Sequence, residues 1–245
     1  TDPEGEPKPD NEESPELRER RDPMLSDRLA ISKQHQQYMV RALQLGLVGM
    51  GVYGLLAPDI GLFLTSIFAL TITVFPNILE GKYDVPIGVG LTLWITSAVF
   101  LHALGVAGVP GVTGNLYADG SPIPFWDHIT HALSASVVAA VGYTVARAID
   151  EHSEAVYLPP RFMFVFILLF VVAFGVFWEV IEFTLGVAAE RFGAAAVLTQ
   201  YGLGDTIADL AFDAVGATIV AIWGTARLSG VVAAIADRLD GESSS

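Results

Sequence analysis

The sequence predicts an all-α fold, a polytopic transmembrane helical bundle of about six helices. Of its 245 residues, 52% are hydrophobic and only 16% are charged, a balance that is not typical of a soluble domain. The charged residues crowd into a few short polar stretches. Between these stretches lie several uncharged runs that approach or exceed the roughly 18 to 20 residues needed to cross a bilayer.

The two ends of the chain differ from its apolar centre. Residues 1–27 are acidic and rich in Pro and Glu, without the pattern of a signal peptide, and are expected to form a disordered cytoplasmic tail. Residues 28–41 mix basic and apolar side chains, which is typical of an amphipathic juxtamembrane helix on the membrane surface. The six-helix transmembrane domain is expected over 42–227, and a cytoplasmic tail that begins with a short helix over 228–245.

The spans follow in order along the chain. Apolar runs predict them near residues 40–57, 60–79, 86–107, 125–147, 162–187 and 204–227. Turn signals separate them, namely Pro58-Asp59, residues 81–84, the Gly- and Pro-rich stretch 109–124, and Pro159-Pro160.

The distribution of basic residues predicts the orientation of the bundle. With six spans, twelve of the thirteen Lys and Arg residues fall on the side of the two termini, and only Arg191 falls on the other. Positive charges near the ends of spans remain in the cytoplasm. Both termini are therefore expected in the cytoplasm and the protein in the plasma membrane.

Charge and cysteine content exclude several classes of function. The net charge of −14 leaves no cationic surface for nucleic acid, so the lipid bilayer is the expected partner. The acidic, lysine-poor balance would also suit a salt-rich environment. Because the chain has no cysteine, any bound metal must use oxygen and imidazole ligands.

Ionisable residues gather at one depth of the last three spans. In the predicted orientation all lie in the outer half of the membrane: Asp127, His128 and His131 on span 4, Glu179 and Glu182 on span 5, and Asp205, Asp209 and Asp213 on span 6. His102, near the outer end of span 3, joins them. Asp127 and His131 are four apart, Glu179 and Glu182 three apart, and the three aspartates of span 6 four and four again, so each helix presents one polar stripe. Because a carboxylate facing lipid is costly, the stripes are expected to share a pocket.

These six carboxylates have no Lys or Arg near them in the spans. They cannot all stay ionised in a low-dielectric site without a positive charge. Either some are protonated or a divalent cation is bound, and carboxylate and imidazole groups suit Zn, Mg, Mn, Ca or non-haem Fe. The expected ligand set is Asp127, His131, Glu179, Glu182, Asp205, Asp209 and Asp213.

Each of these residues also has a structural interpretation. Asp127 and Asp205 stand at helix starts, where aspartate is a favoured N-cap. His102 and His128 fit an interfacial position. Interhelical hydrogen bonding would account for one or two of the deeper residues.

The motifs resemble a known group of membrane proteins. Asp127 and His131 form D-x-x-x-H, Glu179 and Glu182 a glutamate pair, and the last span begins GDTIADLAFDAVGA. Over roughly the last three spans this order is similar to the YjdF-type and, more distantly, the VanZ-like small membrane proteins. Asp127, His131, Glu179, Asp209 and Asp213 match best. The VanZ-like proteins are associated with glycopeptide resistance, without an established chemistry.

Three functions follow as hypotheses. The first is a metal-binding protein open to the extracytoplasmic side, a candidate hydrolase of a lipid-linked or envelope substrate with Glu179 or Glu182 as general base. The second is a cation- or proton-coupled transporter, against which the inner halves of the spans offer almost no ionisable group. The third is a non-catalytic structural or assembly protein.

Overall fold

The computed structural model describes residues 31–109, 114–118, 121–153, 155–192, 198 and 200–243, and its regular structure over them is entirely helical. The helices are α2 (Lys33–Leu56), α3 (Ile60–Tyr83), α4 (Val89–Ala107), α5 (Trp126–His152), α6 (Pro160–Phe192) and α7 (Leu203–Ser243). Each contains a segment long and apolar enough to cross a membrane, which in α7 is Leu203–Gly224. The predicted polytopic all-α class with six spans is confirmed, whereas the orientation of the termini stays a prediction.

Helix α2 begins earlier than the first predicted span. Ser32 caps it by accepting a hydrogen bond from the backbone N–H of His35 at 3.3 Å. Residues 33–41 therefore form one continuous helix with the first span, rather than a separate surface element. The predicted tail over residues 1–27 lies outside the described residues.

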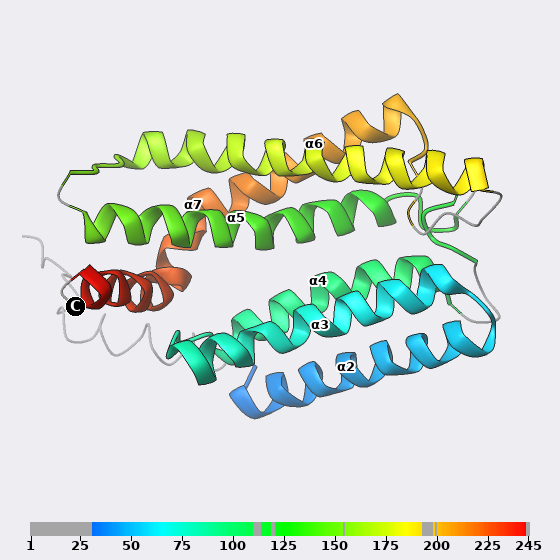
Figure 1. The fold of residues 1–245 in the computed structure, drawn as a ribbon, viewed down its shortest axis with the longest axis horizontal. Coiled ribbons are helices and arrows are strands. Elements are labelled where there is room, and N and C mark those ends of the chain that lie inside the picture. Colours follow the sequence, from blue (N-terminus) through cyan, green and yellow to red (C-terminus); the bar gives the residue numbers. More distant parts are fainter. Residues whose placement is uncertain are drawn as a thin grey trace, which may run out of the picture.

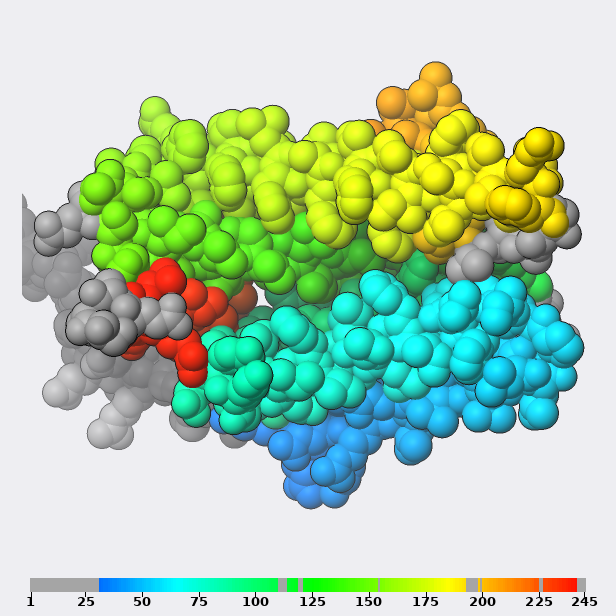
Figure 2. Space-filling view, viewed as in Figure 1, coloured from blue at the N-terminus to red at the C-terminus, as the bar shows by residue number. Residues whose placement is uncertain are grey.

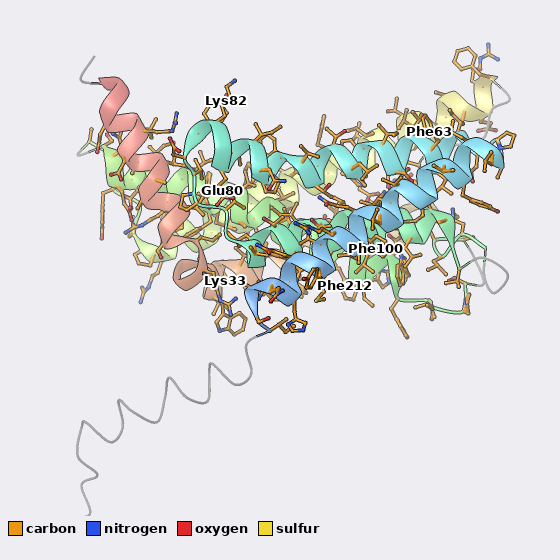
Figure 3. All side chains as sticks on the ribbon, turned by 90° about the horizontal axis from the view of Figure 1, so that it is seen from below. Lys33, Phe63, Glu80, Lys82, Phe100 and Phe212 are labelled. Atoms are coloured by element: carbon orange, nitrogen blue, oxygen red, sulfur yellow. The ribbon has the colours of Figure 1, made fainter. Side chains whose placement is uncertain are left out.

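The helices form two three-helix units that lie side by side, α2 to α4 in one and α5 to α7 in the other (Figure 1). In the first unit Gly46 of α2 leaves room for the ring of Phe100 on α4, since a Cβ at position 46 would lie 2.7 Å from that ring. Figure 3 shows Phe63 and Lys82 toward opposite ends of α3. Helices α4 and α5 connect the two units.

The second unit is built around the contact between α5 and α7. Gly216 of α7 lies so close to α5 that a Cβ there would come within 2.1 Å of the carbonyl oxygen of Ala132. Only a glycine permits this approach of the two backbones. The contact sets the register of the two helices, and it brings their first turns together at one end of the bundle. We call this end, where α5 and α7 begin, the site end.

The last helix extends well past its membrane-spanning segment. Its C-terminal part turns away from the axis of the span and lies across the end of the bundle opposite the site end (Figure 1). There Val231 packs with Val85 and Ile87 from the connection between α3 and α4. Arg238 also donates a hydrogen bond from Nε to the carbonyl oxygen of Tyr83 at 2.7 Å. The predicted short helix after the last span is thus present as a continuation of α7, and it joins the two units.

Candidate metal centre

Polar stripes of three helices converge at the site end. The buried face of α6 carries Gly175, Glu179 and Glu182 at spacings of four and three, and α7 carries Asp209 and Asp213 at a spacing of four. All four of these carboxylates are buried, with Asp209 only 1% exposed. Because α5 is the neighbour of both helices, its own stripe of Asp127 and His131 faces them.

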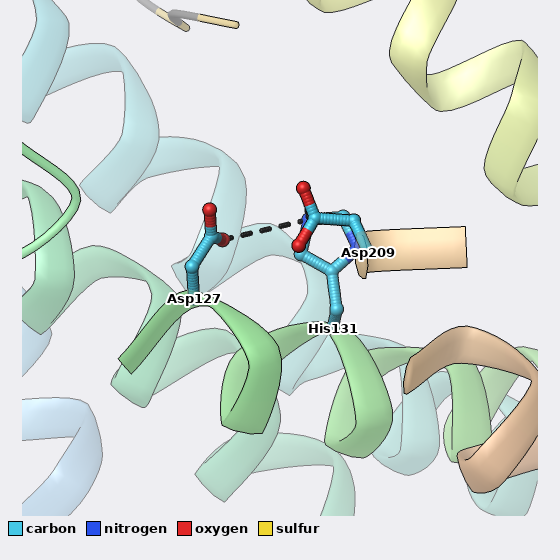
Figure 4. A group of neighbouring side chains, drawn as sticks. All are labelled: Asp127, His131 and Asp209. Carbon is cyan, nitrogen blue, oxygen red and sulfur yellow. Dashed lines mark ion pairs between the residues drawn. The ribbon is translucent and has the colours of Figure 1, made fainter. Parts of the chain in front are cut away.

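Asp127, His131 and Asp209 form the centre of the site (Figure 4). Each offers one ligand atom, and the three atoms lie within 4.8 Å of one another. The Nε2 atom of His131 is 3.6 Å from Oδ1 of Asp127 and 4.0 Å from Oδ2 of Asp209. The structure therefore brings together three of the seven predicted ligands, from two helices, around one imidazole nitrogen. We call these three residues the metal cluster.

Asp213 lies behind the metal cluster rather than in it. Its Oδ1 atom is 3.2 Å from Nδ1 of His131, so it accepts the Nδ1–H proton and leaves the lone pair on Nε2. The backbone of α6 confines this carboxylate, because a Cβ on Gly175 would lie 2.4 Å from Oδ2 of Asp213. A carboxylate that orients a histidine in this way is the usual outer-shell partner at metal sites.

His128 contributes to the site as well, although its spacing suggested only an interfacial position. Its Nδ1 atom lies 3.4 Å from Oδ1 of Asp209. Its ring stacks on Phe212 of α7, with centroids 4.6 Å apart and planes 7° from parallel. His128 therefore contacts Oδ1 of Asp209, whereas Oδ2 of the same carboxylate is the oxygen nearer to Nε2 of His131. The sequence signal was its place one residue after Asp127, on the same helical turn.

Glu179 is held by α7 and by the segment that precedes it. Its Oε2 atom accepts hydrogen bonds from the Thr206 hydroxyl at 2.7 Å and from the Gln200 amide at 3.3 Å. The other oxygen, Oε1, is buried and has no hydrogen-bond partner among the described residues. Since an unpaired buried carboxylate oxygen is costly, a hydrogen-bond donor or a cation beside Oε1 of Glu179 would stabilise the site.

Glu182 and Asp205 occupy separate positions around the metal cluster. Glu182 accepts a hydrogen bond from the indole N–H of Trp178 at 3.0 Å, one turn away on α6. Asp205 lies in the first turn of α7 and accepts from the backbone N–H of Tyr201, just before the helix, at 3.0 Å, so it is not the N-cap residue itself. Neither residue, nor Glu179, belongs to the group of three ligand atoms.

A hydrogen-bonded pair closes one flank of the site. The Tyr117 hydroxyl, from the connection between α4 and α5, lies 3.1 Å from Nδ1 of His102 and donates to the Thr130 hydroxyl at 3.4 Å. Burial raises the pKa of Tyr117, so its hydroxyl stays protonated and can act as a donor. His102 is thus engaged inside the protein. Sequence alone gave no signal for Tyr117, because it lies in an irregular connection.

The donor set fits a divalent metal ion. Ligand atoms that bind one tetrahedral ion at about 2.0 to 2.2 Å lie roughly 3.3 to 3.6 Å apart, close to the separations of 3.6 and 4.0 Å around Nε2 of His131. The cluster carboxylates find their ion-pair partners in His128 and His131 within the described part of the chain. When both imidazoles are neutral, the two carboxylates carry negative charge that a bound cation would compensate.

Comparison with known proteins places the chain in a family. A family model described as "Predicted membrane protein (DUF2238)" matches residues 39–230. That range covers every described span almost completely and all the residues of the site. The resemblance to the YjdF-type and VanZ-like proteins stays a prediction, since the match is to this family description alone.

The chain is also similar to a curated protein over about half of its length. A protein of Thermotoga maritima described as "Uncharacterized protein" is 33% identical over 124 residues, which is 51% of this chain. The aligned part spans 56% of the relative's own length. No solved structure matches the chain. These findings identify a membrane protein family and leave its chemistry to be argued from the site.

Proposed function

The chain belongs to the DUF2238 family of membrane proteins, and from that premise we propose that it binds one divalent metal ion within the membrane. The ligands would be Asp127, His131 and Asp209. The observation that carries the proposal is the convergence of these three ligand atoms within 4.8 Å of one another. In the predicted orientation the site faces the extracytoplasmic side.

The cost of burying charge in a membrane supports a bound cation. Placing an ionised side chain at the centre of a bilayer is unfavourable, by about 2.5 to 3.5 kcal/mol per residue on insertion scales. Asp209 and Asp213 are nearly inaccessible to solvent, and the site end carries Glu179 and Glu182 besides. Two carboxylates and one neutral imidazole suit Zn, Mn or Fe better than Ca or Mg, which prefer oxygen ligands.

We further propose that the site performs hydrolysis. A divalent metal bound there would supply Lewis acidity toward an ester or phosphoester oxygen. Glu179 is the candidate general base, because its unpaired Oε1 can accept a proton. Water has access through a polar pocket of about 300 Å³, which is lined by Asp127, His128, Tyr117 and Asp205, among others.

The distribution of buried charge favours this proposal over cation transport. Glu179, Glu182, Asp209 and Asp213 bury their carboxylates at the site end, whereas the buried carboxylate of Asp150, toward the other end of α5, is paired with Arg147. A conduction path needs polar steps through the full thickness of the membrane. The opposite halves of the described spans instead bury mainly alanines, threonines and branched aliphatic residues.

Elemental analysis of the purified, detergent-solubilised full chain tests the proposal. We expect about one divalent metal ion per chain, retained through dialysis and lost after the His131→Ala substitution. His152→Ala is the matched control, because His152 lies at the other end of α5 and is expected to leave the metal content unchanged. If the wild-type protein retains no metal after exposure to Zn, Mn, Fe, Mg and Ca in turn, the proposal is wrong.

A separate assay tests hydrolysis. The metal-loaded protein in vesicles would be offered phospholipids and lipid-linked phosphoesters, with product release followed by mass spectrometry. Glu179→Gln keeps the hydrogen bonds to Thr206 and Gln200 possible but removes the base, so we expect activity to fall by about 100- to 10,000-fold with metal content unchanged. If the protein binds metal but hydrolyses none of these substrates, the proposed metal site stands and the proposed hydrolase activity is wrong.

A further inference from the structure

An apolar cleft lies beside the metal cluster, between the two three-helix units. It has a volume of about 220 Å³, and its walls come from α3, α4, α5 and α6. Helices α3 and α6 form its two rims and make no close backbone approach to each other in the described residues. In Figure 2 these helices are the lower and upper ridges, with the green atoms of α5 between them.

The lining of the cleft changes from polar to apolar along its length. Toward the site end it presents His102, Thr130 and His131, together with the carboxylate of Asp213. Farther along the same four helices it presents only hydrocarbon, from residues that include Ile72, Ile95, Val138 and Val171. On every helix the apolar lining residues lie deeper in the membrane than the polar ones. The cleft is therefore amphipathic along its axis.

The dimensions of the cleft limit what it can hold. On α5 it extends from Thr130 to Val138, which is roughly 12 Å along a helix at 1.5 Å per residue. Its volume of about 220 Å³ is below the roughly 300 Å³ at which pockets for compact ligands begin. A narrow chain fits such a space, whereas a further helix, at roughly 10 Å in diameter, is too wide.

We infer that the cleft binds a hydrocarbon chain of an amphipathic membrane lipid whose headgroup oxygens reach the metal cluster. The part of this inference that concerns the headgroup rests on the proposed function. The rim side chains are apolar and exposed, among them Phe68 and Phe174, so in a bilayer the cleft opens to the lipid chains around it. A chain that enters there meets only hydrocarbon at the deep end, and its headgroup is directed to His131 and Asp213.

The polar pocket complements this arrangement. Asp127 of the metal cluster lines it, together with His128 and Asp205, whereas His131 of the same cluster lines the cleft. The metal cluster is thus reached from one side through a polar space and from the other through an apolar one. A lipid held in this way would place the junction between its chain and its headgroup at the metal cluster. The substrate class that follows is a lipid with an ester or phosphoester at that junction.

Photo-crosslinking in vesicles tests the inference. The full chain would be reconstituted in phosphatidylcholine that contains a phosphatidylglycerol with a diazirine in one acyl chain, illuminated, and mapped by peptide mass spectrometry. We expect crosslinks at Ala98, Ala135 and Val171, which line the cleft and are at most 4% exposed. Lipid on the outer surface of the bundle does not reach these three residues. If they remain unlabelled while exposed residues are labelled, the inference is wrong.

A filled cleft provides the decisive comparison. Val138→Trp places an indole in the cleft and is expected to lower crosslinking at these buried residues by about tenfold or more, a change of affinity that is easily resolved. Val141→Trp, three residues along the same helix and 58% exposed to lipid, should leave it unchanged. Equal labelling in both variants would overturn the inference.

Two further measurements keep the result interpretable. If Val138→Trp does not fold, the pair Ile72→Trp and Val74→Trp on α3 decides the question in the same way, since Ile72 lines the cleft and Val74 is exposed. Metal content is measured on the same samples. If the cleft is labelled in a protein that holds no metal, lipid binding is supported and the proposed metal-dependent function is wrong. If the protein holds metal but its cleft is not labelled, only the lipid-binding inference is wrong.

Discussion

The Nδ1 atom of His131 lies 3.2 Å from Oδ1 of Asp213, and this contact determines which imidazole nitrogen is free to bind a metal ion. With its proton held on Nδ1, the ring directs the lone pair of Nε2 between Asp127 and Asp209. In the proposed metal site, Asp127, His131 and Asp209 would be the ligands and Asp213 the outer carboxylate that orients His131.

Asp213→Asn should weaken metal binding without abolishing it. The amide oxygen still accepts the Nδ1–H proton, but the lost negative charge makes Nε2 a poorer ligand. We expect the metal dissociation constant to rise by about 10- to 100-fold, as measured by isothermal titration in detergent. An unchanged constant would show that Asp213 does not act through His131.

Asp209→Asn and Asp205→Asn should differ, although both residues lie on one face of α7. Asp209 offers a ligand atom to the metal cluster, whereas Asp205 accepts a hydrogen bond from the backbone N–H of Tyr201. We expect Asp209→Asn to reduce metal affinity by more than the roughly 100-fold upper limit of an outer-shell change. Asp205→Asn should alter the affinity little and lower thermal stability slightly. A comparable loss of metal in both variants would place Asp205 among the ligands.

Gly175→Ala tests the confinement of Asp213 by α6. The added Cβ would lie 2.4 Å from Oδ2 of Asp213, so the carboxylate must move and its hold on His131 weakens. We expect metal affinity to fall by about tenfold. Gly186→Ala, on the same helix with nothing within 4 Å of its Cβ, is the matched control. Equal affinities in the two variants would contradict the proposed route from α6 to His131.

Gly216→Ala should destabilise the second unit. Its Cβ would come within 2.1 Å of the carbonyl oxygen of Ala132, which is backbone and cannot rotate away. We expect a loss of about 1 to 3 kcal/mol in the free energy of unfolding, measured by denaturant titration in mixed micelles. Gly230→Ala, farther along α7 in open space, should be neutral or slightly stabilising because alanine favours the helix.

Tyr117 predicts a loss of stability at alkaline pH. Burial raises the pKa of its hydroxyl in the folded protein, so above the ordinary value of about 10 the unfolded chain releases this proton more readily than the folded one. Stability from this group is therefore full below pH 10 or so and is lost as the pH rises further. We expect the melting temperature of the Tyr117→Phe variant to fall less steeply with rising pH than that of the wild type. Tyr157, at 79% exposed, provides the control, and Tyr157→Phe should show the wild-type decline.

The sequence predicted the architecture because membrane helices are encoded locally. Long apolar runs gave all six spans, and turn residues such as Pro58 and Pro159 separated them. The spacings of Asp127 with His131, and of Asp209 with Asp213, also predicted which residues share a helix face. Because a carboxylate that faces lipid is costly, these polar stripes are expected to converge inside the bundle.

The partners within the site could not be predicted in the same way. Helix spacing does not determine how far each helix is rotated or shifted against its neighbour, and here the close approach of Gly216 to Ala132 sets both. Glu179 of α6 meets Thr206 of α7, and Glu182 meets Trp178 one turn away on its own helix, rather than the cluster ligands. The same rotation brings His128 onto Asp209.

The C-terminal part of α7 has a consequence for motion. Val231 and Arg238 hold the connection after α3, and Asp240 bonds to His152 at the end of α5, so the two units are fastened together at the end far from the site. The Tyr117 hydroxyl also links His102 of α4 with Thr130 of α5 at the site end, so rocking of one unit against the other would pivot about α4 and α5 and move α3 relative to α6. Since the cluster ligands all belong to the second unit, such rocking would widen or narrow the lipid entrance while the ligand geometry stays intact.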